Sequence, residues 1–238
     1  MNSDSKTGEI SYQSLCDIRI LASLTEQEFT QLAGTCAWHR HRPGQEIVVQ
    51  DTPCDEVYFI CSGRVSAKTY STTGKEVTYA ELHAGDHFGE LSALDGQPRV
   101  SFVVTLEESL LSSLSAEAFN AFLEAHPGVM RALLTDLAGR VRALDEKIFE
   151  FSTLSSRNRI HAELLRLADP QRHEDGSAEI APPPTHADLA SRTNTTRESV
   201  TRELNRLKKA GLLEADRSHY KILNVAALGD LVGQPIEL

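Results

Sequence analysis

The segment PGVMRALLTDLAGRVRALDEKIFEFSTL, residues 127–154, divides this sequence of 238 residues into two parts with different patterns. Apolar residues recur along it at alternating intervals of four and three. They are Met130, Leu134, Leu137, Val141, Leu144, Ile148 and Phe151. Taking Leu134 as heptad position a places Val141 and Ile148 at a and leucines at d, which favours a parallel two-stranded coiled coil. The segment therefore predicts a long helix that joins two copies of the chain, and a helix packed on its own domain is the alternative.

The residues before this helix have a β pattern. Between 38 and 113, short runs such as VYFIC and VSFVVTL alternate with turn residues, including Pro-Gly at 43–44 and Asp-Gly at 95–96. Regular turn signals between short β runs predict a small barrel or sandwich. A short amphipathic helix, LTEQEFTQLAGTC at 24–36, is expected to precede them. We therefore expect an N-terminal β domain over residues 15–126.

After the long helix, capping signals predict further helices. Ser155 or Ser156 is placed to cap the first of them. Thr185 followed by Asp188 has the form of a capping box, with Asp in place of the preferred Glu. These signals predict a C-terminal domain over residues 155–238.

The residues that follow Asp188 complete a winged helix-turn-helix pattern. Asn194 lies in the turn, where Asn tolerates a positive φ better than most residues that have a side chain. Another helix starts at Thr195 or Thr196 and ends near Gly211. The stretch LLEADRSHYKIL, 212–223, predicts a hairpin that forms the wing.

Charge is distributed unevenly along the chain. The net charge of −10 argues against a protein that is basic overall. Residues 185–221 nevertheless carry eight Lys or Arg residues against five Asp or Glu residues. A mildly basic module on an acidic body fits contact with nucleic acid through one part of the protein.

Cysteine usage argues against a metal centre. The four cysteines, Cys16, Cys36, Cys54 and Cys61, form no CxxC motif and no tight cluster. Zinc and iron–sulfur sites need such clusters, so we expect free thiols, with redox sensing as the alternative. Because no nucleophile–base pair or metal constellation is evident, we expect neither an enzyme nor a metal site.

Membrane and secretion signals are missing from the sequence. No apolar stretch is long enough to span a bilayer. The N-terminal stretch MNSDSKTGEI has neither a basic n-region nor an apolar h-region. We therefore expect a cytoplasmic protein without a membrane partner.

The helix after Asn194 has side chains suited to DNA. Its exposed face carries Arg197 and Arg202, which can donate two hydrogen bonds to guanine, and Glu198, which can accept from cytosine. Hydroxyls at its N-terminal end suit contacts with phosphates. The alternative is an ordinary solvated face in which Glu198 pairs with Arg202.

A second candidate site lies in DHFGELSALDGQPRVSFVV, residues 86–104. Here Glu90 and Arg99 flank a loop that contains glycine. Arg99 can donate two hydrogen bonds to a phosphate, and Glu90 can accept from a ribose 2′-OH. This combination suits a cyclic nucleotide monophosphate, and a Glu90–Arg99 ion pair in a surface loop is the alternative. The nearby His83 and His87 are expected to be exposed residues at strand ends rather than haem ligands.

The chain resembles the Crp–Fnr family of bacterial transcription regulators. The family's Arg-Glu-x-x-x-Arg motif is present as Arg197, Glu198 and Arg202 within TTRESVTRELNRLKKAGLLE. The β segment, the FGEL…PR loop and the heptad helix also occur in the family's order, so the resemblance covers about residues 15–224. It implies an α+β fold with an N-terminal β-barrel or jelly-roll that binds a cyclic nucleotide, a long coiled-coil dimerisation helix and a C-terminal winged helix-turn-helix.

The resemblance also implies DNA contacts. Arg197 and Arg202 would read guanines, Glu198 would read a cytosine, and three hydroxyl residues would hold phosphates. The candidate DNA-binding residues are Thr185, Thr195, Thr196, Arg197, Glu198, Ser199 and Arg202. The implied target is double-stranded DNA with palindromic TGTGA-like half-sites, and RNA polymerase is an expected partner of the homodimer.

The FGEL…PR loop is similar to the family's phosphate-binding cassette. Members that sense haem-bound gas typically lack an intact cassette, so the resemblance favours a nucleotide over haem. Leu144 and Asp145 fall where cyclic AMP-binding members have a Thr-Ser pair that caps the base. The candidate ligand-binding residues are therefore Phe88, Gly89, Glu90, Leu91, Arg99, Val100, Ser101, Arg140, Leu144 and Asp145.

Departures from the family pattern leave the base open. Val100 replaces a Ser or Thr that often follows the cassette arginine, and Ser101 is expected to point to the opposite face. Asp51 stands where many members have glycine. Asp145 could accept from a guanine edge, or could pair as an e position with Arg140 of a second copy. The effector is therefore expected to be cyclic AMP or cyclic GMP.

These expectations give one leading hypothesis and two alternatives. The leading one is a dimeric, ligand-gated regulator in which nucleotide binding repositions the DNA-reading helices. One alternative is a cyclic nucleotide-dependent regulatory subunit that acts on a protein partner without DNA. The other is a redox or haem sensor on the same fold.

Overall fold

The computed structural model describes residues 12–53, 56–72, 74, 76–169, 172–216 and 218–232. The expectation for Cys54 lies outside the described residues. The chain forms two compact units, and each is described by itself. The first contains described residues up to 69 and from 78 to 140, and the second contains residues 70–77 and those from 141 onward.

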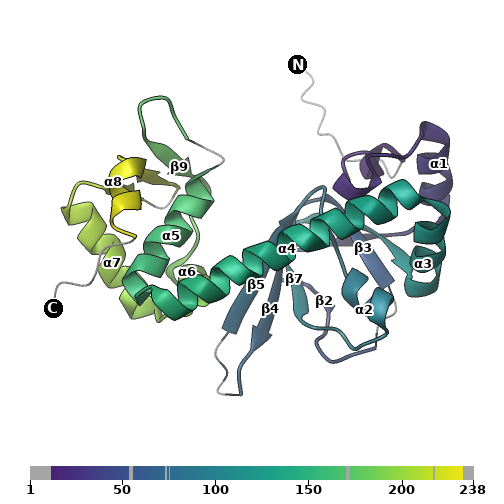
Figure 1. The fold of residues 1–238 in the computed structure, drawn as a ribbon, viewed down its shortest axis with the longest axis horizontal. Coiled ribbons are helices and arrows are strands. Elements are labelled where there is room, and N and C mark those ends of the chain that lie inside the picture. Colours follow the sequence, from purple (N-terminus) through teal and green to yellow (C-terminus); the bar gives the residue numbers. More distant parts are fainter. Residues whose placement is uncertain are drawn as a thin grey trace. The chain divides into compact units, whose positions relative to one another are not determined.

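The first unit contains two antiparallel four-stranded sheets (Figure 1). One has the strand order β1-β8-β3-β6 and the other the order β2-β7-β4-β5. The strands are β1 (Ala37–His41), β2 (Glu46–Val48), β3 (Glu56–Ser62), β4 (Arg64–Tyr70), β5 (Glu76–His83), β6 (His87–Phe88), β7 (Phe102–Thr105) and β8 (Ser109–Ser115). The prediction of a small β domain from short runs and turn residues is confirmed.

Helices flank these strands. Two short 3-10 helices, η1 (Tyr12–Leu15) and η2 (Arg19–Leu21), lead to α1 (Glu26–Thr35). Helix α1 is the predicted amphipathic helix, and Thr25 and Glu28 form a capping box at its start. Helix α3 (Ala116–Ala125) was not predicted, and Ser115 caps its start by accepting from the backbone N–H of Ala118.

The FGEL segment differs from the predicted loop. It contains the six-residue helix α2 (Glu90–Asp95). Gly89 before α2 and Gly96 after it both have left-handed φ values, of 91° and 70°. Because glycine adopts such angles without a Cβ clash, both ends of the short helix can turn sharply.

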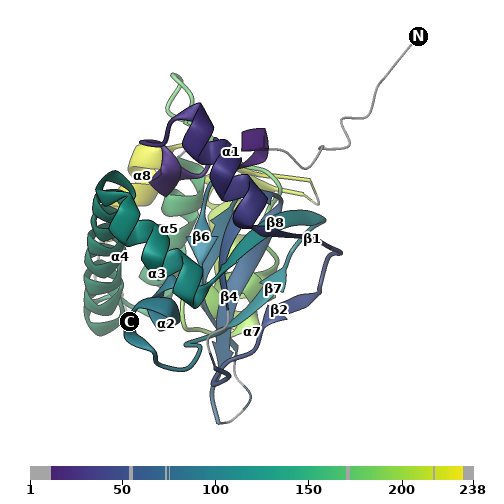
Figure 2. The ribbon, with the colours of Figure 1, turned by 90° about the vertical axis from the view of Figure 1, so that its right-hand side faces the viewer.

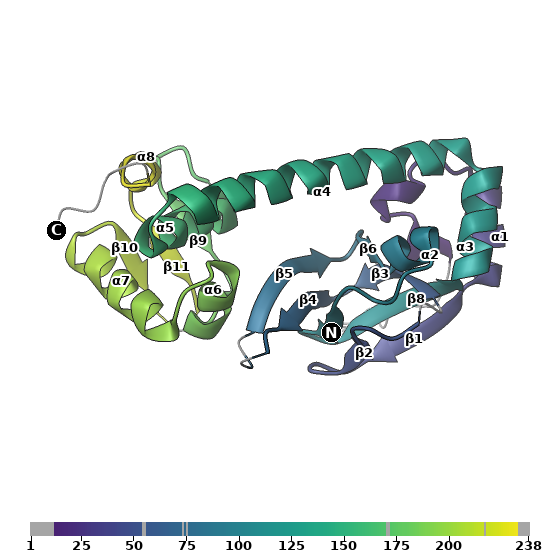
Figure 3. The ribbon, with the colours of Figure 1, turned by 60° about the horizontal axis from the view of Figure 1, so that its bottom comes forward.

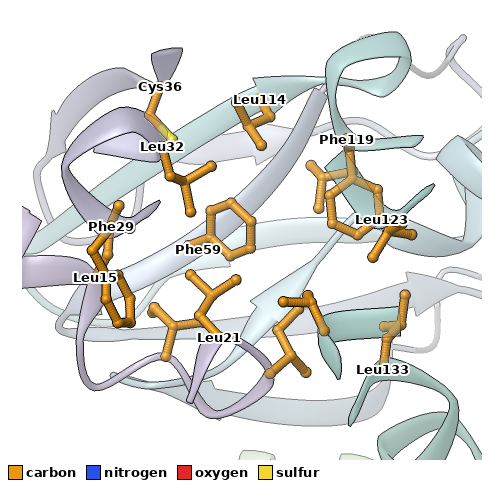
Figure 4. Packing of buried hydrophobic residues seen from close by; sticks show 14 of the residues in the cluster. Leu15, Leu21, Phe29, Leu32, Cys36, Phe59, Leu114, Phe119, Leu123 and Leu133 are labelled. Atoms are coloured by element: carbon orange, nitrogen blue, oxygen red, sulfur yellow. The ribbon is translucent and has the colours of Figure 1, made fainter. Parts of the chain in front are cut away.

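The core of the first unit joins the helices to the sheet that contains β3 and β8. Phe59 on β3 and Phe119 on α3 are fully buried, with ring centroids 6.4 Å apart. Figure 4 shows them among side chains from α1, α3 and the start of the long helix, including Leu32, Leu123 and Leu133. Figure 2 shows α3 next to α2, and α3 contacts α2, β3 and β8. Burial of each such apolar side chain contributes roughly 1.5–3 kcal/mol, so this cluster fixes the strands that hold the cassette.

The long helix α4 (Pro127–Thr153) is present as predicted. Six of its seven heptad residues are classed as exposed in the single chain, with Leu134 at 61% and Ile148 at 63%. Leu137, the seventh, is half-buried against the core of the first unit. An exposed row of apolar residues along a helix indicates a surface that binds another protein chain. The coiled-coil pairing itself stays a prediction.

Among its described residues, the second unit contains the C-terminal half of the long helix, four further helices and a small sheet (Figure 3). The helices are α5 (Ser156–Ala168), α6 (His186–Arg192), α7 (Arg197–Lys209) and α8 (Val225–Asp230). Antiparallel strands β10 (Leu213–Ala215) and β11 (Tyr220–Ile222) form the predicted hairpin. Strand β9 (Ala178–Ile180) pairs with β11, and neither β9 nor α8 was predicted.

The predicted caps of the second unit are confirmed. Ser155 caps α5 by accepting from the backbone N–H of Asn158. Thr185 and Asp188 form the capping box of α6. Asn194 has a positive φ of 49° in the turn before α7. Across the described ranges, no helix combines the length and apolar character that crossing a membrane requires.

Candidate functional site

The cassette is built around Gly89, which joins β6 to α2. Its φ of 91° lies in the left-handed region. A Cβ at this position would lie 2.6 Å from Arg99 Nη1 and 2.8 Å from the carbonyl oxygen of Glu56. Both separations are shorter than real contacts allow, so only glycine lets the backbone approach the arginine this closely.

Arg99 is buried and held in one orientation, with 5% of its surface exposed. Its Nη2 donates to the carbonyl of Glu56 at 2.5 Å and its Nη1 donates to the carbonyl of Gly89 at 3.1 Å. Backbone hydrogen bonds to Asp51 and Thr52 fix the main chain on both sides. The guanidinium is therefore oriented by carbonyl groups, and the alternative Glu90–Arg99 ion pair is not formed.

Glu90 is also buried, with 2% of its surface exposed. One carboxylate oxygen, Oε1, accepts from Arg140 Nη1 at 3.0 Å. The other, Oε2, is buried and receives no hydrogen bond from any described residue. Burial raises the pKa of Glu90 above its ordinary value, although Arg140 acts in the opposite direction. A buried acceptor without a donor is costly, so this oxygen is a site that a ligand hydroxyl can fill.

Arg140 connects the cassette to α4. Besides Glu90, it contacts Asp136 Oδ2 through Nε at 2.7 Å and donates to the carbonyl of His87 at 3.3 Å. Arg140 is a candidate ligand-binding residue, and the heptad pattern also allows it to pair with Asp145 of a second copy. The structure gives it partners in its own chain, from the cassette and from the preceding turn of α4.

The expectation that His87 is exposed is wrong, whereas His83 is exposed as predicted. His87 is 2% exposed and faces α4, where its Nε2 lies 3.9 Å from Asp136 Oδ2. Burial, together with the nearby charge of Arg140, lowers the pKa of His87 to about 4. The ring is therefore neutral at physiological pH. Its place in β6, one residue before a core phenylalanine, accounts for the error, because a two-residue strand has no readable alternation.

The other candidate ligand residues differ in exposure. Phe88 is buried and stacks on Tyr58, with ring centroids 4.9 Å apart. Leu91 and Val100 are exposed, and Ser101 is buried. Val100 and Ser101 precede β7, which starts at Phe102, so the strand alternation expected for this pair does not apply to them. Leu144 and Asp145 are exposed residues of the second unit.

Sequence reasoning missed Glu56 as part of this site. Its carboxylate accepts from Ser113 Oγ at 2.7 Å and from the Tyr58 hydroxyl at 2.6 Å, while its carbonyl orients Arg99. Burial would raise the pKa of Glu56, but these hydrogen bonds keep it below the ordinary value. A backbone acceptor leaves no signal in the residue type, so no sequence pattern could have found it.

The described cysteines have little thiolate character. Burial raises the pKa of Cys36 to about 12 and that of Cys61 to about 11. The pKa of the exposed Cys16 is also raised, mainly by partial burial. Reactive redox cysteines need the opposite shift. No three His, Cys, Asp or Glu side chains in the described ranges are grouped to hold a metal ion.

Helix α7 presents the second candidate site. Thr196 caps it and accepts from the backbone N–H of Ser199 at 3.3 Å. Arg197, Glu198 and Arg202 are exposed and, together with Thr201, line a shallow hollow on the surface. The alternative Glu198–Arg202 ion pair is not among the ion pairs of the described residues. Glu198 instead accepts from its own backbone N–H and from the Thr196 hydroxyl, which lowers its pKa below the ordinary value, so it stays ionised on the exposed face.

The remaining hydroxyl candidates lie around the same end of the motif. Thr185 is an exposed cap residue whose hydroxyl also donates to Asp188 at 2.7 Å. Thr195 is half-buried in the turn. Arg159 on α5 holds this turn, because it donates to the backbone carbonyls of Thr193 at 2.8 Å and Asn194 at 3.2 Å.

Comparison with known families matches both halves of the chain. The model of the cyclic nucleotide-binding domain matches residues 38–126. The model of the Crp-like helix-turn-helix domain matches residues 158–231. These two matches contain the cassette and α7, respectively, in the same order along the chain.

Characterised relatives cover most of the chain. The cyclic AMP receptor protein of Thermus thermophilus is 29% identical over 188 residues, which are 79% of this chain and 84% of the relative. The CRP-like cAMP-activated global transcriptional regulator of Mycobacterium tuberculosis is 28% identical over 164 residues, which are 68% of this chain and 72% of the relative. Both relatives are named for cyclic AMP.

Solved structures share the fold. A CooA variant from Carboxydothermus hydrogenoformans has a TM-score of 0.77 at 20% identity, covering 91% of this chain and 95% of its own. FixK2 from Bradyrhizobium japonicum has a TM-score of 0.71 at 20% identity, covering 84% of this chain and 99% of its own. At this identity the likeness shows the fold alone.

Proposed function

Since the chain belongs to the Crp–Fnr family of transcription regulators, which bind DNA and act as dimers, we propose that it is a homodimeric regulator whose DNA binding is switched by a 3′,5′-cyclic nucleotide. Its relatives are transcriptional regulators, not enzymes. The observation that carries the proposal is the buried oxygen Glu90 Oε2, which lacks a donor beside the oriented guanidinium of Arg99.

The two side chains suit the two halves of a cyclic nucleotide. A ribose 2′-OH is a donor and would satisfy Glu90 Oε2. The cyclic phosphate is an anion, and the N–H groups of Arg99 that are not bonded to carbonyls would donate to it. Gly89 allows both groups to approach the same ligand because any Cβ there would collide with Arg99. We assign cyclic AMP as the first effector to test because both relatives are named for it, with cyclic GMP second.

Arg140 offers a route from the ligand to the dimer helix. It already holds Glu90 from α4 through a 3.0 Å hydrogen bond. A hydroxyl bound to Oε2 would draw charge from the carboxylate and compete with Arg140 for its orientation. Ligand binding would thereby shift the equilibrium between two arrangements of α4. The size of this shift is set by the difference between the ligand's affinities for the two arrangements.

The exposed seam of α4 supplies the proposed dimer contact over residues 127–154. In the dimer, each α7 would enter the major groove of one half-site. Arg197 and Arg202 would donate to guanines and Glu198 would accept from a cytosine. Thr185, Thr196 and Ser199 would contact phosphates, and the target would be a palindrome with TGTGA-like half-sites.

The test is a calorimetric titration of the purified protein with cyclic AMP and cyclic GMP, followed by fluorescence anisotropy on a palindromic duplex with and without the ligand. We expect one ligand to bind and to raise affinity for the duplex at least about tenfold, which corresponds to about 1.4 kcal/mol. Binding of neither ligand would contradict the effector assignment. Ligand binding without any DNA binding would favour the alternative function, a regulatory subunit that acts on a protein partner. A visible absorbance band in the purified protein, which a polypeptide without a chromophore lacks, would favour a haem sensor.

A further inference from the structure

A cluster of charged side chains lies where the buried side of α7 faces α5, on the side of α7 away from Arg197. Its centre is Glu203, which is 5% exposed. Both carboxylate oxygens are used. His161 Nε2 lies 2.6 Å from Oε1, and Arg157 Nε lies 3.3 Å from Oε2, and both residues belong to α5. Arg206, one turn further along α7, donates to both oxygens at 3.0 and 3.1 Å.

Stability alone does not explain this cluster. Removing charges from water costs several kcal/mol per ion, and well-packed apolar residues commonly stabilise a protein as much as a buried ion pair does. His161 is fully buried and its Nδ1 has no hydrogen-bond partner among the described residues, which adds to the cost. Burial acts to raise the pKa of Glu203, but hydrogen bonds from His161 and Arg206 hold it below the ordinary value, so the carboxylate stays ionised. Hydrogen bonds are directional, so this cluster fixes the orientation of α7 relative to α5.

The geometry at issue is the rotation of α7 about its axis. The other buried residues of the helix, Val200, Leu204 and Leu207, make apolar contacts, which have no preferred direction of their own. At about 5–6 Å from the axis, a rotation of about 20° moves a side-chain atom by about 2 Å. Such a shift breaks a hydrogen bond of 2.7–3.2 Å length. A carboxylate bonded from two residues of α5 resists this rotation.

We propose that Glu203 is a positioning residue, held by His161 and Arg157, that fixes the rotation of α7 and so sets how Arg197, Glu198 and Arg202 together meet the base edges. The inference rests on the proposed DNA-binding function. It assigns specificity to a side chain that does not itself touch DNA.

The test compares Glu203→Gln with Glu214→Gln, which removes the same charge at an exposed position of β10. The duplex is first selected from a random pool by the wild-type protein with its effector, so the test does not depend on the TGTGA assignment. For Glu203→Gln we expect affinity for the selected duplex to fall about tenfold or more while affinity for a scrambled duplex is unchanged. Discrimination should weaken at every contacted base pair, and Glu214→Gln should behave as wild type.

Variants of the donor separate positioning from folding. His161→Gln keeps an N–H near the Nε2 position and should retain most of the specificity, whereas His161→Leu should lose it, with the melting temperature of each recorded. Equal losses for selected and scrambled duplexes, or unchanged specificity in both Glu203→Gln and His161→Leu, would overturn the proposal. If the wild-type protein selects no sequence, the proposed function fails and the inference falls with it.

Discussion

The cassette and helix α7 handle charge in opposite ways. In the cassette, Glu90 and Arg99 are at most 5% exposed and are already bonded to Arg140 or to carbonyl groups. On α7, Arg197 and Arg202 are exposed and form no ion pair with the described residues. A small ligand is enclosed, so the protein must orient every group before binding, whereas DNA brings its own array of charges to a surface. Burying charged groups in the cassette therefore lowers the stability of the folded protein, whereas the exposed charges of α7 have little effect on stability.

The comparison predicts that the largest effect of a single substitution is at Arg99. Truncating one partner of a buried, hydrogen-bonded charge pair costs about 2–5 kcal/mol, so Arg99→Ala should weaken cyclic nucleotide binding at least about 30-fold by calorimetry. Arg99→Lys should recover only part of this loss because an ammonium lacks the planar fork of the guanidinium.

The control for Arg99 is Arg42→Ala, an exposed arginine of the same unit. It should bind ligand as the wild type does. Circular dichroism should show that Arg99→Ala remains folded, although the carbonyls of Gly89 and Glu56 lose their donors. Undiminished nucleotide binding by Arg99→Ala would break the assignment of the phosphate site.

Glu90→Gln tests whether the buried charge of Glu90 lowers the stability of the fold while it strengthens nucleotide binding. A hydrogen bond to a charged acceptor contributes about 1.5–3 kcal/mol, so the variant should bind nucleotide roughly tenfold to 100-fold more weakly. Its melting temperature near neutral pH should nevertheless rise. Folding raises the pKa of Glu90 above its ordinary 4.5, and a neutral amide avoids the cost of the buried charge.

The pH dependence gives this test its sign. A raised folded pKa means that the contribution of Glu90 to stability is fully present below its ordinary pKa and is lost as pH rises through the folded pKa. The variant lacks this loss, so its advantage in free energy of unfolding should grow from about pH 4 to about pH 7. A constant difference across that range would show that Glu90 carries no burial cost.

The same contrast explains what could be predicted from the sequence. Glu90 and Arg99 could be proposed from the chemistry of the two side chains around a loop that contains glycine, and the family resemblance supplied Arg197, Glu198 and Arg202 through the Arg-Glu-x-x-x-Arg motif. The helix caps at Thr185, Thr196 and Ser155 and the turn at Asn194 were also predictable, because each depends on local backbone needs. The β runs and the heptad helix followed from periodicity alone.

The remainder of the site depends on contacts between distant segments. Glu56 is 43 residues from Arg99 and acts through its carbonyl, and Arg140 is 50 residues from Glu90. Neither contact has a local pattern. The burial of His87 also required the fold, because α4 covers it. The short helix α2 was missed since six residues cannot show helical periodicity.

A smaller effect is expected on α7. Arg197→Ala should lose about 1–3 kcal/mol of discrimination at one guanine, with little change elsewhere in the half-site. Anisotropy titrations with single-base variants of the duplex measure this directly. Lys209→Ala, an exposed cation at the end of α7, serves as the comparison and should change affinity uniformly and weaken its salt dependence. A uniform loss for Arg197→Ala would mean that the residue contacts phosphate and not a base.

The smallest effect is expected at Asn194, which supports α7 without facing a ligand. Its φ of 49° is unfavourable for residues with a Cβ, less so for Asn. Asn194→Ala should lower the free energy of unfolding by about 1 kcal/mol, and Asn194→Gly should leave it within about 0.5 kcal/mol because glycine adopts this angle freely. Urea denaturation measures the free energy of unfolding of both variants.

Arg159 donates to the backbone carbonyl of Asn194, a contact that both variants retain, so base discrimination should be unchanged in each. Loss of discrimination at several base pairs in Asn194→Gly would show that the turn, together with the Glu203 cluster, sets the orientation of α7.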